Sequence, residues 1–441
     1  MKFPHALIAG AALASLAGAA AAADGRYELF DGLEAKTGFK AYGYLWVGFS
    51  SNDTTTHDQA TKGHSNGPIA GPSDEGLQLN ALQLVLERNI KSNIVPRFTP
   101  LPGPMPQQFS WGLHFEGTYG RNGLPAQMQG IETNWGINET TEGTTAGTNR
   151  QNYLSLGQVY GQMYFPVLKG ATLQIGRFGS GIGYEAPTNH TYTPNFFYSR
   201  SYSFLSSPDQ VAGALGSVNL MNGDYGLVMA ELGVVQGRQN WQDNNDSKSV
   251  IGYLHWRSPD MKYSLDYGFM RGNEQNDPGE HVQAPTARVI SPRDQLRQHH
   301  SLSAWWRPDQ TWALHAEALH GRQDGDGKAG TIDILDGNFY KGGSYTGYNA
   351  EVRYRTSPTM QWGLRAETFD DPKGVALFPL SAAKGRFNAV TAGLRYQLTP
   401  NVLLRPELRY DWQDKQGALK AFGGGSETQQ ATVSVDALFY F

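Results

Sequence analysis

Residues 177–204 read RFGSGIGYEAPTNHTYTPNFFYSRSYSF. They lie between two segments with the pattern of short β-strands, Ala171–Phe178 and Gln210–Leu220. Connections longer than about a dozen residues in a compact architecture are usually functional or disordered. After Phe178 this one carries seven aromatic side chains, which give it more apolar surface than a disordered segment has. We therefore expect an ordered loop, with the rest of the chain forming a wall around it.

The composition limits the classes of protein to which the chain can belong. It has 441 residues, 53 glycines, no cysteine and a formal charge of -4, with 12% aromatic and 17% charged residues. The absence of cysteine excludes a disulfide framework and any thiolate metal site. A pI of about 6.3 gives no basic footprint for nucleic acid. The length fits two or three soluble domains or one large barrel.

The first 23 residues have the features of a secretory signal peptide. Lys2 and His5 precede an alanine-rich apolar run, Ala6–Ala22, and small residues follow up to Ala23, just before Asp24. A positive start, a short apolar centre and a small-residue cleavage site describe such a peptide. A membrane anchor is the alternative, although the run is barely long enough to span a bilayer. We expect cleavage after Ala23 and a mature domain of residues 24–441.

The rest of the chain alternates with the period of β-strands. In Phe109–Tyr119, residues Phe109, Trp111, Leu113 and Phe115 point to one side, and small or polar residues point to the other. Alternation of apolar and polar residues is typical of a transmembrane strand, although a soluble sandwich also shows it. No second apolar run is long enough to span a membrane as a helix, so a membrane-embedded chain must form a closed barrel.

The turns favour the barrel. Five short connectors contain proline, near residues 166, 259, 308, 358 and 400, and the Asn222-Gly223-Asp224 triplet is a two-residue hairpin signal. In the second half, long polar segments alternate with these turns, as long outer loops alternate with short periplasmic turns in outer-membrane barrels. Tryptophan residues flank the short turns, as in an aromatic girdle. We predict an all-β, antiparallel, up-and-down transmembrane barrel of about 16 strands with an inward-folded loop.

The predicted strands are Thr37–Ser51, Leu77–Ile90, Phe109–Arg121, Tyr153–Phe165, Ala171–Phe178, Gln210–Leu220, Tyr225–Gly237, Ser249–Arg257, Lys262–Arg271, Arg297–Arg307, Thr311–Gly321, Tyr345–Arg355, Met360–Phe369, Phe387–Leu398, Val402–Gln413 and Glu427–Phe441. Only one periplasmic turn is unusually long, the proline-rich Ile94–Pro106. A plug, a lid or a contact with the cell wall would explain its length.

Charged residues share one face of several strands. An arginine or lysine facing lipid at mid-membrane would cost about 2–4 kcal/mol, so this face must enclose water. On the predicted strand Val402–Gln413, the side chains of Val402, Leu404 and Leu408 are expected to face lipid. The predicted lining residues of the wall are Glu351, Arg353, Arg355, Arg365, Glu367, Arg395, Arg405, Glu407 and Arg409.

The inward loop adds further candidates for the constriction. These are Arg177, Glu185, Tyr192, Tyr198 and Arg200. In one interpretation an arginine-rich wall opposes the acidic part of the loop and sets which solutes enter. In the other, the charges pair across strands and brace the barrel. The two are compatible, and the excess of arginine leads to the hypothesis of a mild preference for anions or neutral hydroxylated solutes.

Four stretches carry a resemblance to a known family. They are LNALQLVLE at Leu79–Glu87, Gly112–Gly120, Gln158-Val159-Tyr160 and above all Leu173–Tyr202, where GRFGSGIGYEA is followed by FFYSRSYSF. In these stretches the chain resembles the Putative beta-barrel porin-2, OmpL-like family. This resemblance implies an outer-membrane channel of a Gram-negative bacterium. Porins of this size are often trimers, so a homotrimer is the assembly suggested by analogy.

The function expected from these patterns is a porin in outer-membrane lipid that lets small hydrophilic solutes diffuse passively, with no cofactor, metal or nucleic acid. One alternative is a channel selective for sugars or organic anions, with Tyr184, Tyr192 and Tyr198 as a stacking slide. Another is a non-conducting barrel for adhesion or anchoring. The last is an enzyme at the rim, which we do not expect because no Ser/His/Asp grouping stands out in the sequence.

Overall fold

The computed structural model describes residues 29–54, 66–128, 130–132, 152–185, 195–243, 245–274, 295–325, 332–333, 338–339, 342–377, 383–414 and 420–441. Its strands are β1 (Lys40–Asn52), β2 (Gly76–Arg88), β3 (Ile94–Val95), β4 (Thr99–Pro100), β5 (Ser110–Gly120), β6 (Tyr153–Ser155), β7 (Val159–Phe165), β8 (Ala171–Gly179), β9 (Gln210–Gly223), β10 (Gly226–Val235), β11 (Ser249–Arg257), β12 (Tyr263–Glu274), β13 (Gln295–Trp306), β14 (Trp312–Asp324), β15 (Ile332–Asp333), β16 (Asn338–Phe339), β17 (Gly342–Ser357), β18 (Met360–Asp371), β19 (Gly385–Thr399), β20 (Val402–Asp414) and β21 (Gln429–Tyr440). The short helices are α2 (Leu33–Thr37), η1 (Arg121–Gly123), α3 (Tyr202–Ser206) and η5 (Gly423–Gly425).

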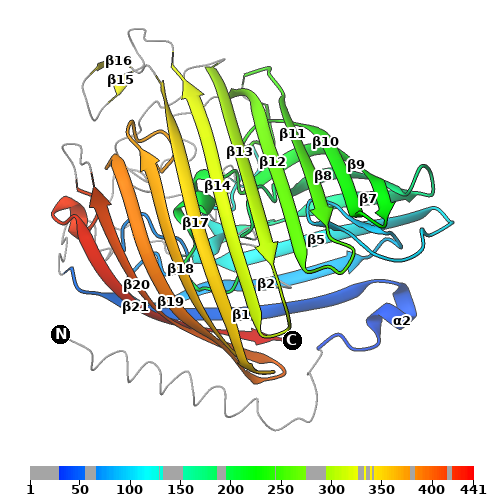
Figure 1. The fold of residues 1–441 in the computed structure, drawn as a ribbon, viewed down its shortest axis with the longest axis horizontal. Helices are drawn as coiled ribbons and strands as arrows, with labels where there is room; N and C mark the ends of the chain where they lie inside the picture. Colours follow the sequence, from blue (N-terminus) through cyan, green and yellow to red (C-terminus); the bar gives the residue numbers. More distant parts are fainter. Residues whose placement is uncertain are drawn as a thin grey trace.

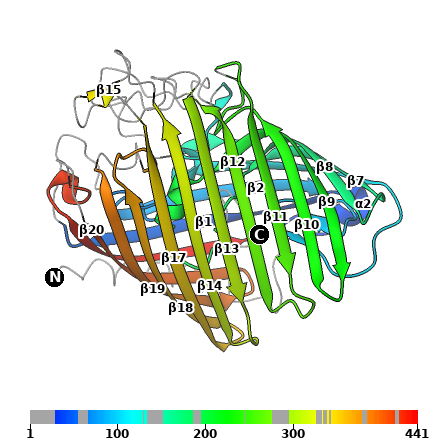
Figure 2. The same ribbon diagram turned by 45° about the horizontal axis from the view of Figure 1, so that its top comes forward.

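These strands form a closed antiparallel barrel, as the sequence predicts (Figures 1 and 2). Each wall strand pairs with its neighbours in chain order, and β1 closes the ring by pairing with both β2 and β21. The main sheet has 17 strands, but β6 and β7 both pair with β5 and occupy one position, which gives 16 positions around the wall. Closure leaves no unpaired strand edge in the lipid.

The strand boundaries agree closely with the predicted ones, and Ser249–Arg257 is the same in both. Two details differ. The segment Tyr153–Phe165 is divided into β6 and β7, because Gly157 adopts a positive φ of 48° that interrupts the strand. The hairpin near Asn222 turns at residues 224–225 instead, since Gly223 pairs with Gly226.

The outer face of the barrel is apolar and the inner face is polar. On β5, Trp111, Leu113 and Phe115 are exposed, whereas His114 and Glu116 are buried. Exposed apolar side chains and buried polar ones are the reverse of a soluble protein, and they fit a wall with lipid outside. Val402 is an exception to the predicted outer face, because it is fully buried beside the turn at the start of β20.

Short turns and long loops lie at opposite edges of the barrel, apart from one connection. Six turns between wall strands span two to five residues each, whereas 21 residues, 89–109, join β2 to β5. Within this connection β3 and β4 form a small hairpin whose Arg97 is only 5% exposed. The amide of Arg97 donates to the Glu231 carboxylate of β10 over 2.7 Å. The proline-rich turn therefore folds back against the inner face of the wall.

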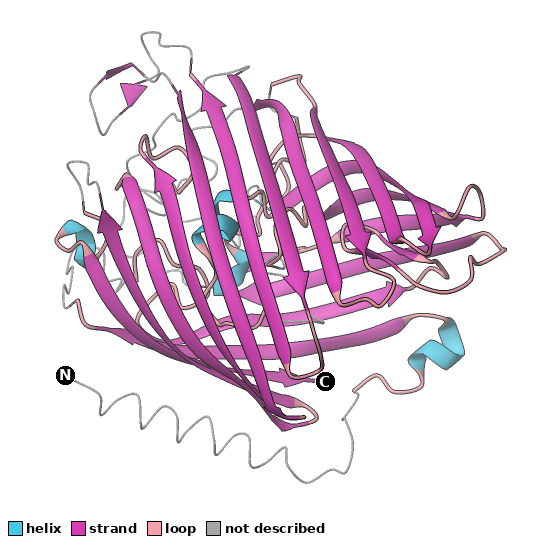
Figure 3. Cartoon of the chain, in the orientation of Figure 1, coloured by secondary structure: helices cyan, strands magenta, loops and turns pink. Residues whose placement is uncertain are grey.

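Figure 3 shows that helices are few and that α3 lies within the ring of strands. Among the described residues, none of the helices has the length and apolar character needed to cross a bilayer. Tyr202 of α3 packs in a buried cluster with Phe369 of β18 and Phe387 of β19. This cluster anchors the segment that carries α3 to the wall.

Candidate functional site

Residues 195–207, here called the inner segment, lie against the inner face of the barrel and include the last part of the loop at residues 177–204 that stands out in the sequence. Ser201 caps the N-terminus of α3, since its hydroxyl accepts a hydrogen bond from the Phe204 amide over 3.1 Å. Glu185 in turn accepts from the Ser201 amide over 2.9 Å and from the Ser201 hydroxyl. The carboxylate of Glu185 therefore holds the helix start and fixes the two ends of the loop together.

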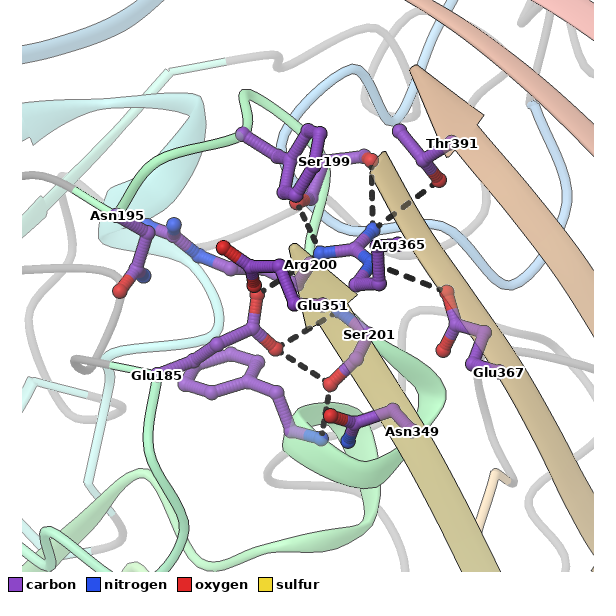
Figure 4. Close-up of polar contacts among 12 residues, drawn as sticks. Glu185, Asn195, Ser199, Arg200, Ser201, Asn349, Glu351, Arg365, Glu367 and Thr391 are labelled. Atoms are coloured by element: carbon purple, nitrogen blue, oxygen red, sulfur yellow. Dashed lines mark hydrogen bonds and ion pairs between the residues drawn. The ribbon is translucent and has the colours of Figure 1, made fainter. Parts of the chain in front are cut away.

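Arg365 of β18 is the main link between the wall and the inner segment (Figure 4). Its guanidinium lies 3.1 Å from the Glu185 carboxylate and 3.4 Å from that of Glu367. It also donates to the carbonyl oxygen of Ser199 over 3.2 Å and to its hydroxyl over 3.1 Å. A planar guanidinium with several fixed donors suits this branched contact, which a lysine could not make.

Two arginines of β20 extend the attachment. Arg405 donates to the carbonyl oxygens of Asn195 over 2.5 Å and of Phe197 over 3.1 Å. Arg409 donates to the carbonyl oxygen of Arg200 over 2.9 Å. Each guanidinium satisfies backbone acceptors of a segment that lies in neither a long helix nor a sheet, and such acceptors are costly when buried alone.

Carboxylates of the wall also bind the inner segment, by accepting hydrogen bonds from its amides and from one hydroxyl. Glu407 accepts from the Ser199 amide over 3.2 Å, and Glu367 accepts from the Tyr202 amide over 2.7 Å. Asp411 accepts from the Tyr202 hydroxyl over 2.6 Å. Alternating arginines and acids on β18 and β20 therefore match the alternating carbonyls and amides of the inner segment.

Inner-face glycines make room for the aromatic rings of the segment. Gly363 of β18 and Gly393 of β19 are register partners, and a Cβ on either would collide with a ring, that of Phe196 or of Phe197 respectively. A Cβ on Gly48 of β1 would likewise collide with the Tyr198 hydroxyl. Three consecutive aromatic residues thus fit into gaps left by glycines on three different strands.

Burial shifts the pKa of two groups of the segment without changing their protonation state at neutral pH. Burial lowers the pKa of Arg200 to about 10, and the nearby Glu185 carboxylate opposes this shift, so the guanidinium is a cation at neutral pH. Burial raises the pKa of Tyr198, so its hydroxyl stays protonated. That hydroxyl donates to Asn80 over 3.1 Å and accepts from Gln78 over 2.8 Å.

The predicted lining residues fall into three groups. Arg365, Glu367, Arg405, Glu407 and Arg409 meet the inner segment, together with Glu185 and Arg200. Arg177 is buried elsewhere, where it pairs with Glu132 and donates to the carbonyl of Ala126. Arg353 pairs with Glu351 and is half-buried, as is Arg395, whereas Arg355 is exposed. Tyr192 lies outside the described residues.

The expectation that these arginines line water needs correction for four of them. Arg177, Arg365, Arg405 and Arg409 are at most 1% exposed. Their strands do point them inward, but folded loop segments cover them. Sequence reasoning also missed Glu132, Asn80 and the three glycines. For Gly363 and Gly393 the available signal was an arginine two residues further along the same face of the strand.

The described residues include no group of three or more histidines, aspartates and glutamates placed to hold a metal ion. The contacts described above fix a bulky segment to one side of the barrel interior.

Comparison with known proteins agrees with this architecture. The family model described as Putative beta-barrel porin-2, OmpL-like, matches residues 38–441. No curated protein matches the sequence.

Solved structures of outer-membrane proteins share the fold. The outer membrane channel DcaP of Acinetobacter baumannii aligns with a TM-score of 0.53 and 11% identity, over 91% of this chain and 97% of that chain. An anion-selective porin from Comamonas acidovorans aligns with a TM-score of 0.50 and 11% identity, over 91% and 99%. The trimer form of OmpT, an outer membrane protein of Vibrio cholerae, gives a TM-score of 0.50 and 7% identity, over 91% and 99%. At these identities the likeness concerns the fold alone.

Proposed function

This chain belongs to the Putative beta-barrel porin-2, OmpL-like family of outer-membrane β-barrel channels, and we propose that it lets small hydrophilic solutes diffuse passively through a water-filled passage narrowed by the inner segment. The observation that carries the proposal is the set of buried hydrogen bonds from Arg365, Arg405 and Arg409 to residues 195–200. A segment held at so many points keeps a fixed position, so the passage would have a constant width.

The charges that face water support a preference for anions. The arginines that contact the inner segment lie beside Glu185, Glu367, Asp411 or Asp436, so little of their charge is left for solutes. Arg355 of β17, by contrast, is exposed, and Arg353 is only half-buried although it pairs with Glu351. Charges that line a water-filled passage with low-dielectric walls focus their electric field on passing ions. We therefore assign the preference to these two residues.

Conductance measurements test the proposal. Purified protein in planar bilayers should give steady single-channel currents in KCl, and the reversal potential across a KCl gradient should have the sign of chloride preference. Arg353→Gln and Arg355→Gln should each shift that potential toward zero. Clear cation selectivity of the wild-type channel would contradict the anion preference, and a complete lack of current would favour a non-conducting barrel.

Uptake of sugars separates a general pore from a selective one. The swelling rate of liposomes that contain the protein should decrease smoothly as the sugars outside increase in size. A rate that depends on sugar identity at constant size would favour the substrate-selective alternative. Hydrolysis of lipid or peptide by the purified protein would be the result expected of a rim enzyme.

Two further points belong to the same proposal. We propose that residues 1–23 are removed on export, so that N-terminal sequencing of protein from the outer membrane begins at Asp24. We also propose a homotrimer, by analogy with the trimer form of Vibrio cholerae OmpT. Mass measurement of the detergent-solubilised protein tests the assembly.

A further inference from the structure

Four side chains on the inner face form a ladder in which rings and guanidinium groups alternate. The Arg353 guanidinium lies 4.9 Å from the centre of the Phe196 ring and 4.7 Å from that of Trp305. The Arg307 guanidinium lies 4.6 Å from the centre of the same Trp305 ring. The ladder runs from the inner segment to the edge of the barrel where the short turns lie.

The ladder faces the interior of the barrel. On β13, His299, Ser301 and Ser303 are buried on the inner face, and Trp305 continues this alternation. Trp305 is half-buried and Arg307, one residue beyond the end of β13, is exposed. A solute at this edge of the passage can therefore reach both the ring and the guanidinium.

The positive charge at this place is only partly neutralised. Arg353 pairs with Glu351, and Arg257 lies 2.7 Å from Asp266. Arg307 makes no ion pair within the part of the chain that the structure describes. Partial burial, followed by repulsion from Arg353 and Arg257, lowers the pKa of Arg307. Two like charges near one cation make the binding of an anion there more favourable.

Further groups behind Trp305 lack hydrogen-bond partners. The His315 ring centre lies 4.6 Å from that of Trp305 and 3.7 Å from that of Tyr184. His315 is 4% exposed, and in the described structure neither of its ring nitrogens has a hydrogen-bond partner. The Tyr184 hydroxyl also has none. These rings pack against Trp305 and hold it in place.

From this arrangement we propose that Trp305, Arg307 and Arg353 form a binding subsite for a planar organic anion, of the class of the aromatic carboxylates. The solute ring would stack on the part of Trp305 that faces the passage, and its carboxylate would accept hydrogen bonds from Arg307. A neutral sugar would leave the charge of Arg307 unmatched, and a small inorganic anion would not use the ring. The inference rests on the proposed function, since it makes this subsite part of the permeation path.

Current block in planar bilayers tests the subsite with a matched pair of probes. Benzoate and cyclohexanecarboxylate have the same charge and nearly the same size, but only benzoate is aromatic. Benzoate should block the KCl current at a concentration about three- to ten-fold lower, the range of one aromatic contact. Trp305→Leu should remove this difference, and Arg307→Gln should weaken the binding of both probes about ten-fold.

Neighbouring residues provide controls. Trp306 is exposed on the outer face, where it stacks on Tyr263, so Trp306→Leu removes a tryptophan without touching the ladder. Arg322→Gln removes an exposed arginine of β14 that pairs with Asp324 and lies outside the ladder. Both should leave the half-blocking concentrations within two-fold of wild type. Trp305→Phe keeps a ring and should keep the preference for benzoate.

The outcomes distinguish the two proposals. Equal block by the two probes in a conducting wild-type channel overturns the subsite and leaves the porin function intact. An unchanged preference in Trp305→Leu also overturns it. No KCl current from folded wild-type protein would overturn the porin function, and the subsite with it. If Trp305→Leu does not fold, Arg307→Gln decides, because an exposed side chain tolerates this change.

Discussion

The Arg365 guanidinium of β18 lies 3.1 Å from the Glu185 carboxylate, and both side chains are almost completely removed from solvent. Breaking a buried pair by removing one partner costs about 3–5 kcal/mol, because the remaining charge stays buried. Glu367, the other carboxylate beside Arg365, keeps Arg409 at 3.2 Å. Removal of Arg365 should therefore affect the Glu185 side of the contact most.

We predict that Arg365→Leu loosens the inner segment near Glu185 and Ser199 while the barrel stays folded. Single-channel conductance should increase and open-channel current noise should rise, because the segment no longer has a fixed position. Arg386→Leu is the control, since Arg386 and Asp370 are both partly exposed and lie 3.5 Å apart. Exposed pairs contribute about 0–1 kcal/mol. A quiet channel of wild-type conductance in Arg365→Leu would contradict the proposed constriction.

The gap at Gly363 leads to a prediction about packing. Valine favours strands, but a side chain at position 363 would collide with the Phe196 ring. Such overpacking costs about 1–3 kcal/mol, so Gly363→Val should lower the melting temperature in circular dichroism. The loss should be smaller when Phe196→Ala is present, because the colliding ring is then absent.

Gly161 of β7 provides the matched control for this change. A Cβ on Gly161 would meet no atom within 4 Å, so Gly161→Val should not destabilise the barrel. If Gly363→Val and Gly161→Val behave alike, the ring does not occupy the gap as described.

The backbone of Arg97 leads to a prediction about the small hairpin of β3 and β4. Arg97 has a φ of 71°, in the left-handed region that favours glycine. Its guanidinium donates to the Gly179 carbonyl over 2.6 Å and to the Gln158 side chain over 3.3 Å. The left-handed conformation costs about 1–2 kcal/mol, whereas hydrogen bonds from a charged group contribute about 1.5–3 kcal/mol each.

Arg97→Gly should therefore loosen the hairpin even though it relieves the backbone. Hydrogen exchange of the hairpin amides should become faster. The conductance of the channel should increase, because the hairpin is then held less firmly against the inner face of the wall. Lys91→Ala, an exposed change in the same connection, should alter neither quantity. Slower exchange in Arg97→Gly would mean that the turn conformation matters more than the side-chain contacts.

The wall could be predicted from the sequence because its signals are local. Alternation places Arg405, Glu407 and Arg409 on one face of a single strand, and lipid outside forces that face inward. Short turns then set where each strand ends. The loop at residues 177–204 was also found from local features, its length and its aromatic content.

The covering of the arginines could not be predicted in this way. Arg405 binds the carbonyl oxygens of Asn195 and Phe197, more than 200 positions earlier in the chain. Backbone carbonyls occur at every residue, so no sequence pattern marks the ones that are used. The gap at Gly363 is similar: the glycine is visible in the sequence, but the ring that fills it comes from another part of the chain.

The closure of the barrel leads to the last prediction. Asp436 of β21 lies 2.5 Å from Arg405 of β20 and accepts from the Trp46 indole of β1 over 2.6 Å, so one carboxylate links three strands around the closing seam. Asp436→Leu would leave Arg405 buried without this partner, and we expect a loss of about 3–5 kcal/mol in the free energy of unfolding by urea. Arg405→Met combined with Asp436→Leu should lose less than Asp436→Leu alone, because no charge is then left unpaired at the seam. Asp414→Leu, at the exposed end of β20, should change the unfolding free energy by less than about 0.5 kcal/mol. If Asp436→Leu is no more harmful than Asp414→Leu, the carboxylate does not hold the seam, and backbone pairing of β1 with β21 alone must close the barrel.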